Sequence, residues 1–367
     1  MRPMAHFLGR AGWRYPRVVR SDFTPLDRLI YTASQAARFG WFYSQYRRAQ
    51  RQITPAVRKE DAPRDSPSTA ELLLSLFALF RRDLKNIQAG HYAMPPDMWP
   101  RPDRVLEVNR RFFRDLRDVD RRRQAGTGDE VFRALRNEDP AYPRYFLQNF
   151  HYQSDGYLSD ESAELYDYQV EILFSGGADA MRRQALVPLA EFMRGRPAGA
   201  TRLVDVACGT GRLLRFASDA HPLLRMTGID LSQPYLDHAR RAIQARRTVS
   251  LATANAERLP LPDASVDVIT DVFLFHELPE RVRATVVAEM ARVLRPGGQI
   301  LHVDTIQMGD EPRFDPLLGF FPKAYHEPYF ANYVASDLDE LFAGTGLMAI
   351  SHANAFLSKV SVFEKAA

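Results

Sequence analysis

Residues 203–214 read LVDVACGTGRLL, a short apolar run followed by a glycine-containing loop and the start of a helical pattern. The apolar run contains Asp205, and the loop reaches Gly211. Glycine lets a backbone approach a ligand closely because it has no Cβ. The free N–H groups at the start of a helix suit an anionic or polar ligand group. We therefore expect a strand, a ligand-binding loop and a helix in this order.

Further strands and helices are expected to alternate along the rest of the chain. Strands are expected over residues 202–206, 224–230, 249–254, 266–273 and 299–304, with helices to 219, over 234–246 and over 280–294. Strands that alternate with helices predict a doubly wound, mostly parallel α/β sheet covered on both faces. Ligands of such sheets bind beyond the carboxyl ends of the strands. Asp230 ends the second strand, where a carboxylate can accept hydrogen bonds from both hydroxyls of a ribose.

A dinucleotide site shares these features, but its usual signature is Gly-x-Gly-x-x-Gly. The loop here continues from Gly209 and Gly211 into Arg212, Leu213 and Leu214, so the last glycine is missing. This counts against a nicotinamide cofactor.

Four segments in this order resemble the class I S-adenosylmethionine (SAM)-dependent methyltransferases: LVDVACGTGRLL (203–214), MTGIDLS (226–232), ANAERLPLPDASVDVI (254–269) and ELPERVRATVVAEMARVLRPGGQILHVD (277–304). The resemblance is strongest to the group that includes the ubiquinone and menaquinone C-methyltransferases. It covers about residues 200–305 and extends weakly back to about 150. It implies a Rossmann-like fold, SAM as the cofactor with S-adenosylhomocysteine as its product, and methyl transfer as the activity.

The resemblance also implies roles for individual residues. Asp205 and the loop Ala207, Cys208, Gly209, Thr210 and Gly211 would hold the methionine part of SAM, Asp230 the ribose hydroxyls, Leu231 one adenine face, and Asn255, Ala256 and Glu257 the adenine edge, with Asp271 and Phe273 beside the transferable methyl group. Two positions depart from the family pattern. Ala207 stands where glycine is usual, and Asn255 stands where aspartate is usual, although an amide oxygen can still accept a hydrogen bond.

The acceptor should approach after the fourth strand, where Phe275-His276-Glu277-Leu278-Pro279 lies. Methyl transfer requires alignment of acceptor and methyl group, and a weak nucleophile also needs a base, often histidine. His276 and Glu277 are therefore candidates for catalysis, with a capping or pocket-lining role for His276 as the alternative. Asp304, at the end of the fifth strand, is a candidate for substrate contact.

Two further aromatic segments are candidates for the acceptor site. A predicted insertion over residues 306–335 carries Tyr325, His326 and Tyr329, of which His326 is a catalytic candidate and the tyrosines are substrate candidates. A predicted lid over residues 151–198 carries Tyr152 and Tyr166 as substrate candidates. The alternatives are a surface loop packed on the sheet edge and ordinary interdomain packing.

Residues 1–150 are predicted to form a separate all-helical domain, with residues 53–68 as a linker or loop, before a methyltransferase domain over 151–367. This half carries 28 Lys+Arg against 17 Asp+Glu, whereas the remainder carries 21 against 28. One explanation is solvated arginine-rich helices that pair with their own carboxylates; the other is a face for an anionic lipid or partner. The aromatic and basic segment 39–51 is either a core-facing helix or a peripheral membrane contact.

Other features narrow the function. With a single cysteine the chain has no internal disulfide, which favours a reducing, cytoplasmic location. No His-x-x-x-His or carboxylate cluster at ligand spacing predicts a metal site. The Asn/Asp-Pro-Pro-Tyr motif of amino-nitrogen methyltransferases is absent, which lowers nucleic acid as an acceptor.

We therefore predict a SAM-dependent methyltransferase that acts on carbon or oxygen of a small apolar or aromatic acceptor. The alternatives are a SAM-binding enzyme with other chemistry, and a non-catalytic SAM-binding or membrane-surface interaction protein. The sequence leaves the oligomeric state open.

Overall fold

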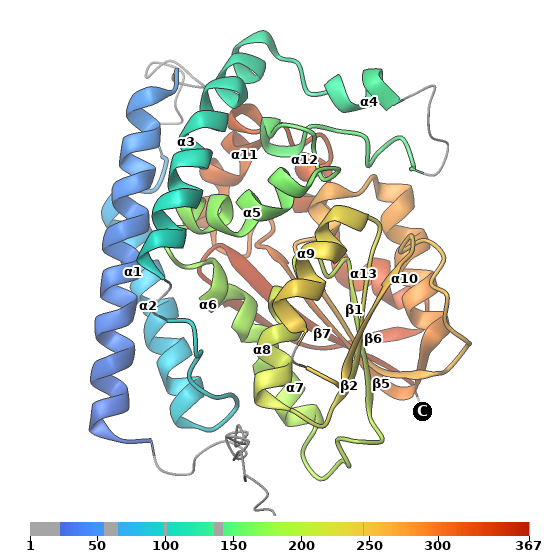
Figure 1. The fold of residues 1–367 in the computed structure, drawn as a ribbon. Helices are drawn as coiled ribbons and strands as arrows, with labels where there is room; N and C mark the ends of the chain where they lie inside the picture. The colour runs from blue at the N-terminus through green and yellow to red at the C-terminus, as the bar shows by residue number, and fades with distance from the viewer. Residues whose placement is uncertain (1–22, 55–64, 99–100, 136–141, 245, 367) are drawn as a thin grey trace, which may run out of the picture.

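The structure is a computed structural model that describes residues 23–54, 65–98, 101–135, 142–244 and 246–366. Within these residues a seven-stranded sheet has the order β3-β2-β1-β4-β5-β7-β6 (Figure 1). The strands are β1 (Arg202–Val206), β2 (Arg225–Asp230), β3 (Val249–Thr253), β4 (Val266–Val272), β5 (Leu294–Thr305), β6 (Leu347–Ala355) and β7 (Ser358–Lys365). Strands β1 to β5 are parallel, and β7 lies antiparallel between β5 and β6.

The sequence predictions for the first five strands are confirmed. The antiparallel pair β6 and β7 was not predicted. Residues 178–192 form α6 (Ala178–Arg182), the 3₁₀ turn η3 (Arg183–Ala185) and α7 (Leu186–Phe192). Residues 295–298 lie inside β5, where the register with β4 shifts.

The helices of the sheet region are α8 (Arg212–Ala220), α9 (Gln233–Ile243), α10 (Glu280–Val293), α12 (Phe330–Val334) and α13 (Leu338–Ala343). The helices that precede the first strand in the chain include α1 (Pro25–Gln52), α2 (Thr69–Gln88), α3 (Pro102–Ala125), α4 (Glu130–Leu135) and α5 (Asp160–Leu173). Short 3₁₀ turns are η2 (Phe150–Tyr152), η4 (Phe275–Glu277) and η5 (Pro312–Phe314), and α11 (Asp315–Ala324) follows η5.

Two apolar cores lie on the two faces of the sheet. One joins α10, α12 and α13 to residues such as Val204, Ile269 and Ile300. The other joins α7, α8 and α9 to residues such as Leu203 and Val268. The sheet is therefore covered on both faces, as the alternating pattern predicts.

The N-terminal helices contribute to the second core directly. Tyr31 from α1 and Ile87 from α2 belong to the same buried cluster as Val360 from β7. A buried ion pair adds to this contact, since the Arg183 guanidinium lies 2.6 Å from the Asp83 carboxylate. The division into domains 1–150 and 151–367 stays a prediction. The predicted linker lies largely outside the described residues, which resume at residue 65.

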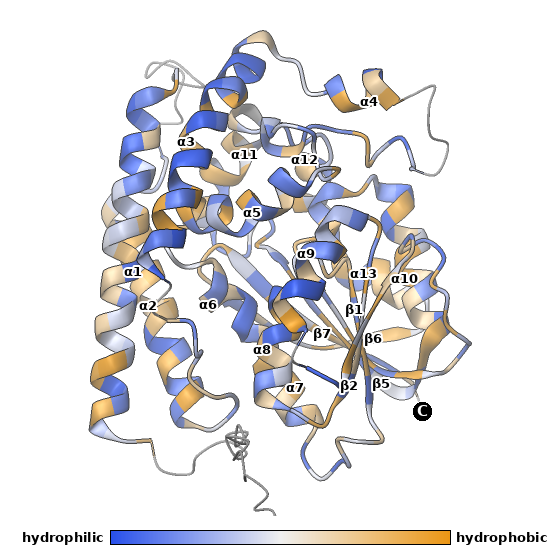
Figure 2. Ribbon diagram, viewed as in Figure 1, coloured by the Kyte–Doolittle hydropathy of each residue, from blue (hydrophilic) through white to orange (hydrophobic). Residues whose placement is uncertain are grey.

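The start of α2 follows the sequence signal. Ser68 and Glu71 form a capping box, in which each side chain binds the backbone N–H of the other. Helix α3 is mostly hydrophilic in Figure 2, whereas α2 is more apolar. Arginines of α3 pair with nearby carboxylates, for example Arg122 with Glu130 and Arg123 with Asp120. These pairs fit the explanation that the basic half neutralises part of its own charge.

The aromatic segment 39–51 lies in α1 and packs inward in part. Phe42 is buried, and the Trp41 indole N–H donates to the Tyr168 hydroxyl at 3.0 Å. These contacts support a core-facing helix, and contact with a lipid surface stays a prediction. Within the described residues, no helix has the length and apolar character needed to cross a bilayer.

Candidate functional site

The loop between β1 and α8 has an unusual backbone. Ala207, Gly209 and Gly211 have φ angles of 56°, 52° and 74°, in the left-handed region that favours glycine. The Gly209 N–H donates to one oxygen of the Asp230 carboxylate at 2.8 Å, and the Ser232 N–H donates to the other at 2.8 Å. Asp230 thereby ties the loop to the end of the neighbouring strand β2.

The loop lies where the strand order reverses, because β1 has β2 on one side and β4 on the other. A cleft opens at this point, as expected for a doubly wound sheet. Of the cofactor residues predicted from the sequence, those that line the cleft are Asp205, Ala207, Cys208, Gly209, Thr210, Asp230, Leu231, Asn255, Ala256 and Phe273. Those that do not line it are Gly211, Glu257 and Asp271.

Each of these three residues has a supporting contact. The left-handed backbone of Gly211 begins α8, and a Cβ there would lie 3.1 Å from the Ala239 Cβ. Glu257 accepts a hydrogen bond from the Tyr145 hydroxyl at 2.7 Å. The Asp271 carboxylate lies 2.6 Å from His302 Nδ1, away from the cleft.

The cleft combines polar and apolar walls that fit the parts of SAM. Leu231, Ala254 and Ala256 offer an apolar wall for a planar base. Arg182 also lines the cleft, 5.8 Å from the Phe273 ring, and its guanidinium, which pairs with Asp167 and Asp179, suits a carboxylate. Asp205 is almost fully buried, and burial raises its pKa to about 7. The residues present therefore fit an amino-acid group at one end and a nucleoside at the other.

Cys208 behaves as a small apolar group. It is buried, and burial raises the pKa of its thiol well above the usual range. A protonated thiol is a poor nucleophile, which fits the sequence interpretation of a space-filling residue.

His276 and Asp304 form a buried pair behind the cleft. His276 Nδ1 lies 2.5 Å from the Asp304 carboxylate, which also accepts the Phe275 N–H at 2.8 Å. Burial alone lowers the pKa of His276, but the Asp304 carboxylate outweighs burial and raises this pKa to about 10. Neither residue lines the cleft. This geometry favours a charged, positioning imidazole over a neutral base.

Glu277 is the residue of this segment that reaches the cleft. The Tyr157 hydroxyl donates a hydrogen bond to its carboxylate. Burial raises the pKa of Glu277 to about 7, a value that suits proton transfer near neutral pH.

A second cavity of about 440 Å³ lies beside the cleft, within the size range of sites for small organic ligands. We call it the apolar chamber. Its lining comes from α1, α3, η2, α5 and α11, and includes Ile53, Phe112, Leu116, Val119, Ile172, Leu173, Leu317, Phe320 and Phe321. Tyr166 lines both the chamber and the cofactor cleft.

Some of the predicted substrate and catalytic residues line these cavities, and others do not. Tyr152, Tyr166 and Tyr325 line the chamber. Tyr329 and His326 line neither cavity, and His326 Nε2 lies 3.0 Å from the Gln148 side-chain oxygen. The sequence thus brings three tyrosines to one cavity, whereas His326 packs against a neighbouring loop.

Tyr157, which the sequence places with Tyr152 and Tyr166 in the predicted lid, lines the cofactor cleft. No role was predicted for three residues at or between the cavities: Arg182, His151 and Glu327. Arg182 lies inside the predicted lid, so the basic residues of that segment were a usable signal. His151 has a φ of 55°. Glu327 lies in a loop, where no periodicity predicts the direction of a side chain.

Comparison with known proteins agrees with this geometry. The family described as "Methyltransferase domain" matches residues 203–298. Over 112 residues the chain is 38% identical to the demethylmenaquinone methyltransferase of Bacillus licheniformis, which covers 30% of this chain and 47% of that protein. Over 145 residues it is 35% identical to the demethylmenaquinone methyltransferase of Thermus thermophilus, covering 39% and 62%. The chain thus spans about half to three-fifths of the length of these relatives.

Among solved structures, a SAM-dependent methyltransferase from Aquifex aeolicus aligns with a TM-score of 0.40 at 17% identity, covering 56% of this chain and 98% of that chain. A putative sarcosine dimethylglycine methyltransferase from Galdieria sulphuraria aligns with a TM-score of 0.42 at 14% identity, covering 53% and 88%.

Proposed function

Because the chain belongs to the class I SAM-dependent methyltransferases, we propose that it transfers a methyl group from SAM to an apolar small molecule held in the apolar chamber. The observation that carries this proposal is the position of the chamber, which shares Tyr166 with the cofactor cleft. An acceptor in the chamber would reach the cleft at this shared wall.

The lining of the chamber points to an elongated acceptor with an oxygenated ring. Aliphatic and aromatic side chains from α3, α5 and α11 would cover an alkyl or aromatic body. Polar and charged side chains also line the chamber, among them Asp115, Arg123, His151, Tyr152 and Gln153, and such groups suit hydroxyl or carbonyl oxygens. The two relatives named above are demethylmenaquinone methyltransferases, which supports hydroquinones and phenols as the first acceptors to test.

The residues of this chain have separate tasks in the proposed reaction. When bound, SAM supplies an electrophilic methyl group on a sulfonium. Asp205, Asp230 and Arg182 would bind its polar groups, and Tyr157 and Tyr166 would exclude water from the junction. Glu277 lines the cleft and would accept the proton of the acceptor, held in place by the Tyr157 hydroxyl.

The test measures transfer of labelled methyl from SAM to a panel of hydroquinones and phenols with alkyl tails of different length. Val119 lines the chamber, so Val119→Trp should narrow it and reduce transfer strongly while the dissociation constant for SAM stays unchanged. Val108 lies on the same helix outside the lining, so Val108→Trp is the matched control.

Each outcome is informative. Transfer that falls only in Val119→Trp supports the chamber as the acceptor site. Equal transfer in both variants would contradict it. SAM binding without any methylated product by mass spectrometry would instead favour other SAM-dependent chemistry or a non-catalytic role.

A further inference from the structure

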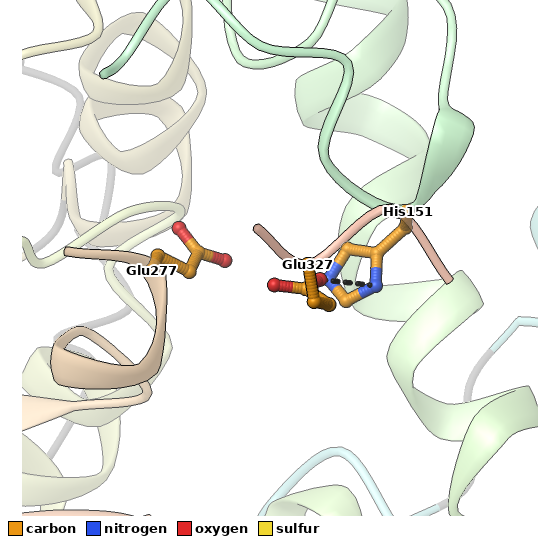
Figure 3. A group of neighbouring side chains, drawn as sticks. All are labelled: His151, Glu277 and Glu327. Carbon is orange, nitrogen blue, oxygen red and sulfur yellow. Dashed lines mark ion pairs between the residues drawn. The ribbon is translucent and has the colours of Figure 1, made fainter. Parts of the chain in front are cut away.

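Three titratable side chains converge between the two cavities (Figure 3). His151 comes from η2, Glu277 from η4, and Glu327 from the loop before α12. One donor atom from each lies within 4.8 Å of the other two. Glu277 lines the cofactor cleft and His151 lines the apolar chamber, so the cluster belongs to the wall that separates them.

Glu327 is the central member of this cluster. Its side chain is fully buried, and one carboxylate oxygen lies 3.0 Å from His151 Nδ1. Apart from this ion pair, neither oxygen has a hydrogen-bond partner among the described residues. Figure 3 shows the carboxylates of Glu277 and Glu327 facing each other across a gap.

Two buried carboxylates that face each other need a compensating positive charge, because removing unpaired anions from water is costly. The His276 imidazole lies 3.9 Å from the Glu277 oxygen that accepts the Tyr157 hydroxyl. The His151 imidazole lies 3.0 Å from one oxygen of Glu327, which leaves the Glu327 oxygen that faces Glu277 without a positive partner. The gap between Glu277 and Glu327 is therefore a position where a cation would be stabilised.

The donor set suits a divalent metal ion. Metal–ligand bonds of about 2.0–2.2 Å place neighbouring donors on one ion roughly 3–4 Å apart. His151 Nδ1 and the Glu327 oxygen, 3.0 Å apart, already have such a separation, whereas the Glu277 donor, within 4.8 Å of the other two, would move toward them. Carboxylate ligands suit Mg²⁺ and Mn²⁺, and an imidazole favours the transition metals.

We propose that His151, Glu277 and Glu327 bind a divalent cation, with Mn²⁺ as the best match, in the wall between the cofactor cleft and the apolar chamber. Three protein ligands leave coordination positions open. An anionic oxygen of the acceptor, such as a phenolate or enolate, would take one of them. With the cation bound, Glu277 would serve as a ligand and the acceptor would bind as its anion, in place of proton transfer to Glu277. This role in substrate binding rests on the proposed function, whereas the metal site itself does not.

The test is titration of Mn²⁺ into the full-length chain, after removal of metals with a chelator, followed by calorimetry and electron paramagnetic resonance. We expect one Mn²⁺ per chain. Glu327→Gln and His151→Gln should each weaken binding at least about 10-fold, since even outer-shell changes at metal sites cost 10–100-fold. Glu311→Gln is the control, because Glu311 pairs with Arg313 outside the cluster.

Thermal unfolding and SAM binding of each variant check that it is folded. Absence of Mn²⁺ and Zn²⁺ binding in the wild type, or binding that persists in both cluster variants, overturns the proposal. Because no acceptor or methyl transfer is needed, this failure is separate from a failure of the proposed methyltransferase function.

Discussion

The cofactor cleft and the apolar chamber meet at Tyr166, but they are built in different ways. The cleft is lined mainly by loops that directly follow β1, β2, β3 and β4, within residues 205–278. The chamber is assembled from α1, α3, η2, α5 and α11, which are spread over residues 46–325. A ligand site made by strand ends has a local sequence signature, whereas a site between distant helices has none. Substitutions in each region test how far the strand-end region and the helical region are independent.

The largest effect should come from the contact that joins the N-terminal helices to the rest of the molecule. Asp83 is fully buried and accepts hydrogen bonds from Arg183, from the Tyr31 hydroxyl at 2.6 Å and from the Tyr92 hydroxyl at 2.7 Å. Asp83→Ala leaves a buried guanidinium without its partner, so the free energy of unfolding should fall by about 3–5 kcal/mol. Chemical denaturation monitored by circular dichroism measures this loss.

The shape of the transition also tests the predicted domain division. If the helices and the sheet region unfold together, Asp83→Ala shifts one cooperative transition. Two transitions, of which only one moves, would show an independent helical domain. Asp103→Ala is the control, because its pair with Arg101 is exposed to solvent and exposed ion pairs contribute little to stability.

Substitution of Asp230 tests the cofactor cleft alone. Its carboxylate holds the Gly209 and Ser232 N–H groups, and hydrogen bonds to charged groups contribute about 1.5–3 kcal/mol each. Asp230→Ala should therefore weaken SAM binding about 100-fold, measured by calorimetry. Asp237→Ala should leave affinity unchanged, because Asp237 pairs with Gln233 and Arg240 on α9 and does not line the cleft. An apolar fluorescent probe should still bind to the chamber of the Asp230→Ala variant. If the probe no longer binds, the cofactor cleft and the apolar chamber are not independent.

The sequence predicts a site built from strand ends better than a site built between distant helices. Asp205, Gly209 and Asp230 were found because a strand, a loop and a helix fix their positions locally. The sequence singled out His326, but it is the side chain of Glu327 that lies beside His151. The direction of a loop side chain depends on backbone angles that leave no periodic pattern. Strands β6 and β7 form a hairpin across residues 356–357, so a local signal was present and was missed, whereas the pairing of β7 with β5 joins segments distant in sequence and has no local signature.

Asp205 gives the cofactor cleft a pH dependence. Burial raises its pKa to about 7, so the apo protein holds a neutral carboxyl at pH 6 and a carboxylate at pH 8. An ammonium group of the cofactor binds the carboxylate better, so the affinity for SAM should rise with pH and level off above about 8. At pH 6 roughly one-tenth of the carboxyl is ionised, which corresponds to an affinity about 10-fold below the plateau.

The stability of the apo protein should change in the opposite direction. Because the folded pKa exceeds the unfolded value, the native state holds more protons between about pH 4 and 7, and the contribution of Asp205 to stability is lost as pH rises through this range. Asp205→Asn should flatten both profiles. A SAM affinity of the wild type that is constant from pH 6 to 8 would contradict the prediction.

The smallest effect concerns Ala207, which stands where the family usually has glycine. Its φ of 56° costs an L-residue about 1–2 kcal/mol, and a glycine at this position would avoid that cost. Glycine has more conformational freedom in the unfolded state, and this offsets about 0.5–1 kcal/mol of the stabilisation. Ala207→Gly should therefore raise the free energy of unfolding by up to about 1 kcal/mol. Ala264→Gly is a matched control, since Ala264 has a φ of 47° in an exposed turn away from the cleft. A gain in Ala264→Gly with a loss in Ala207→Gly would mean that the Ala207 methyl group packs in the cleft and contributes more than its backbone strain costs.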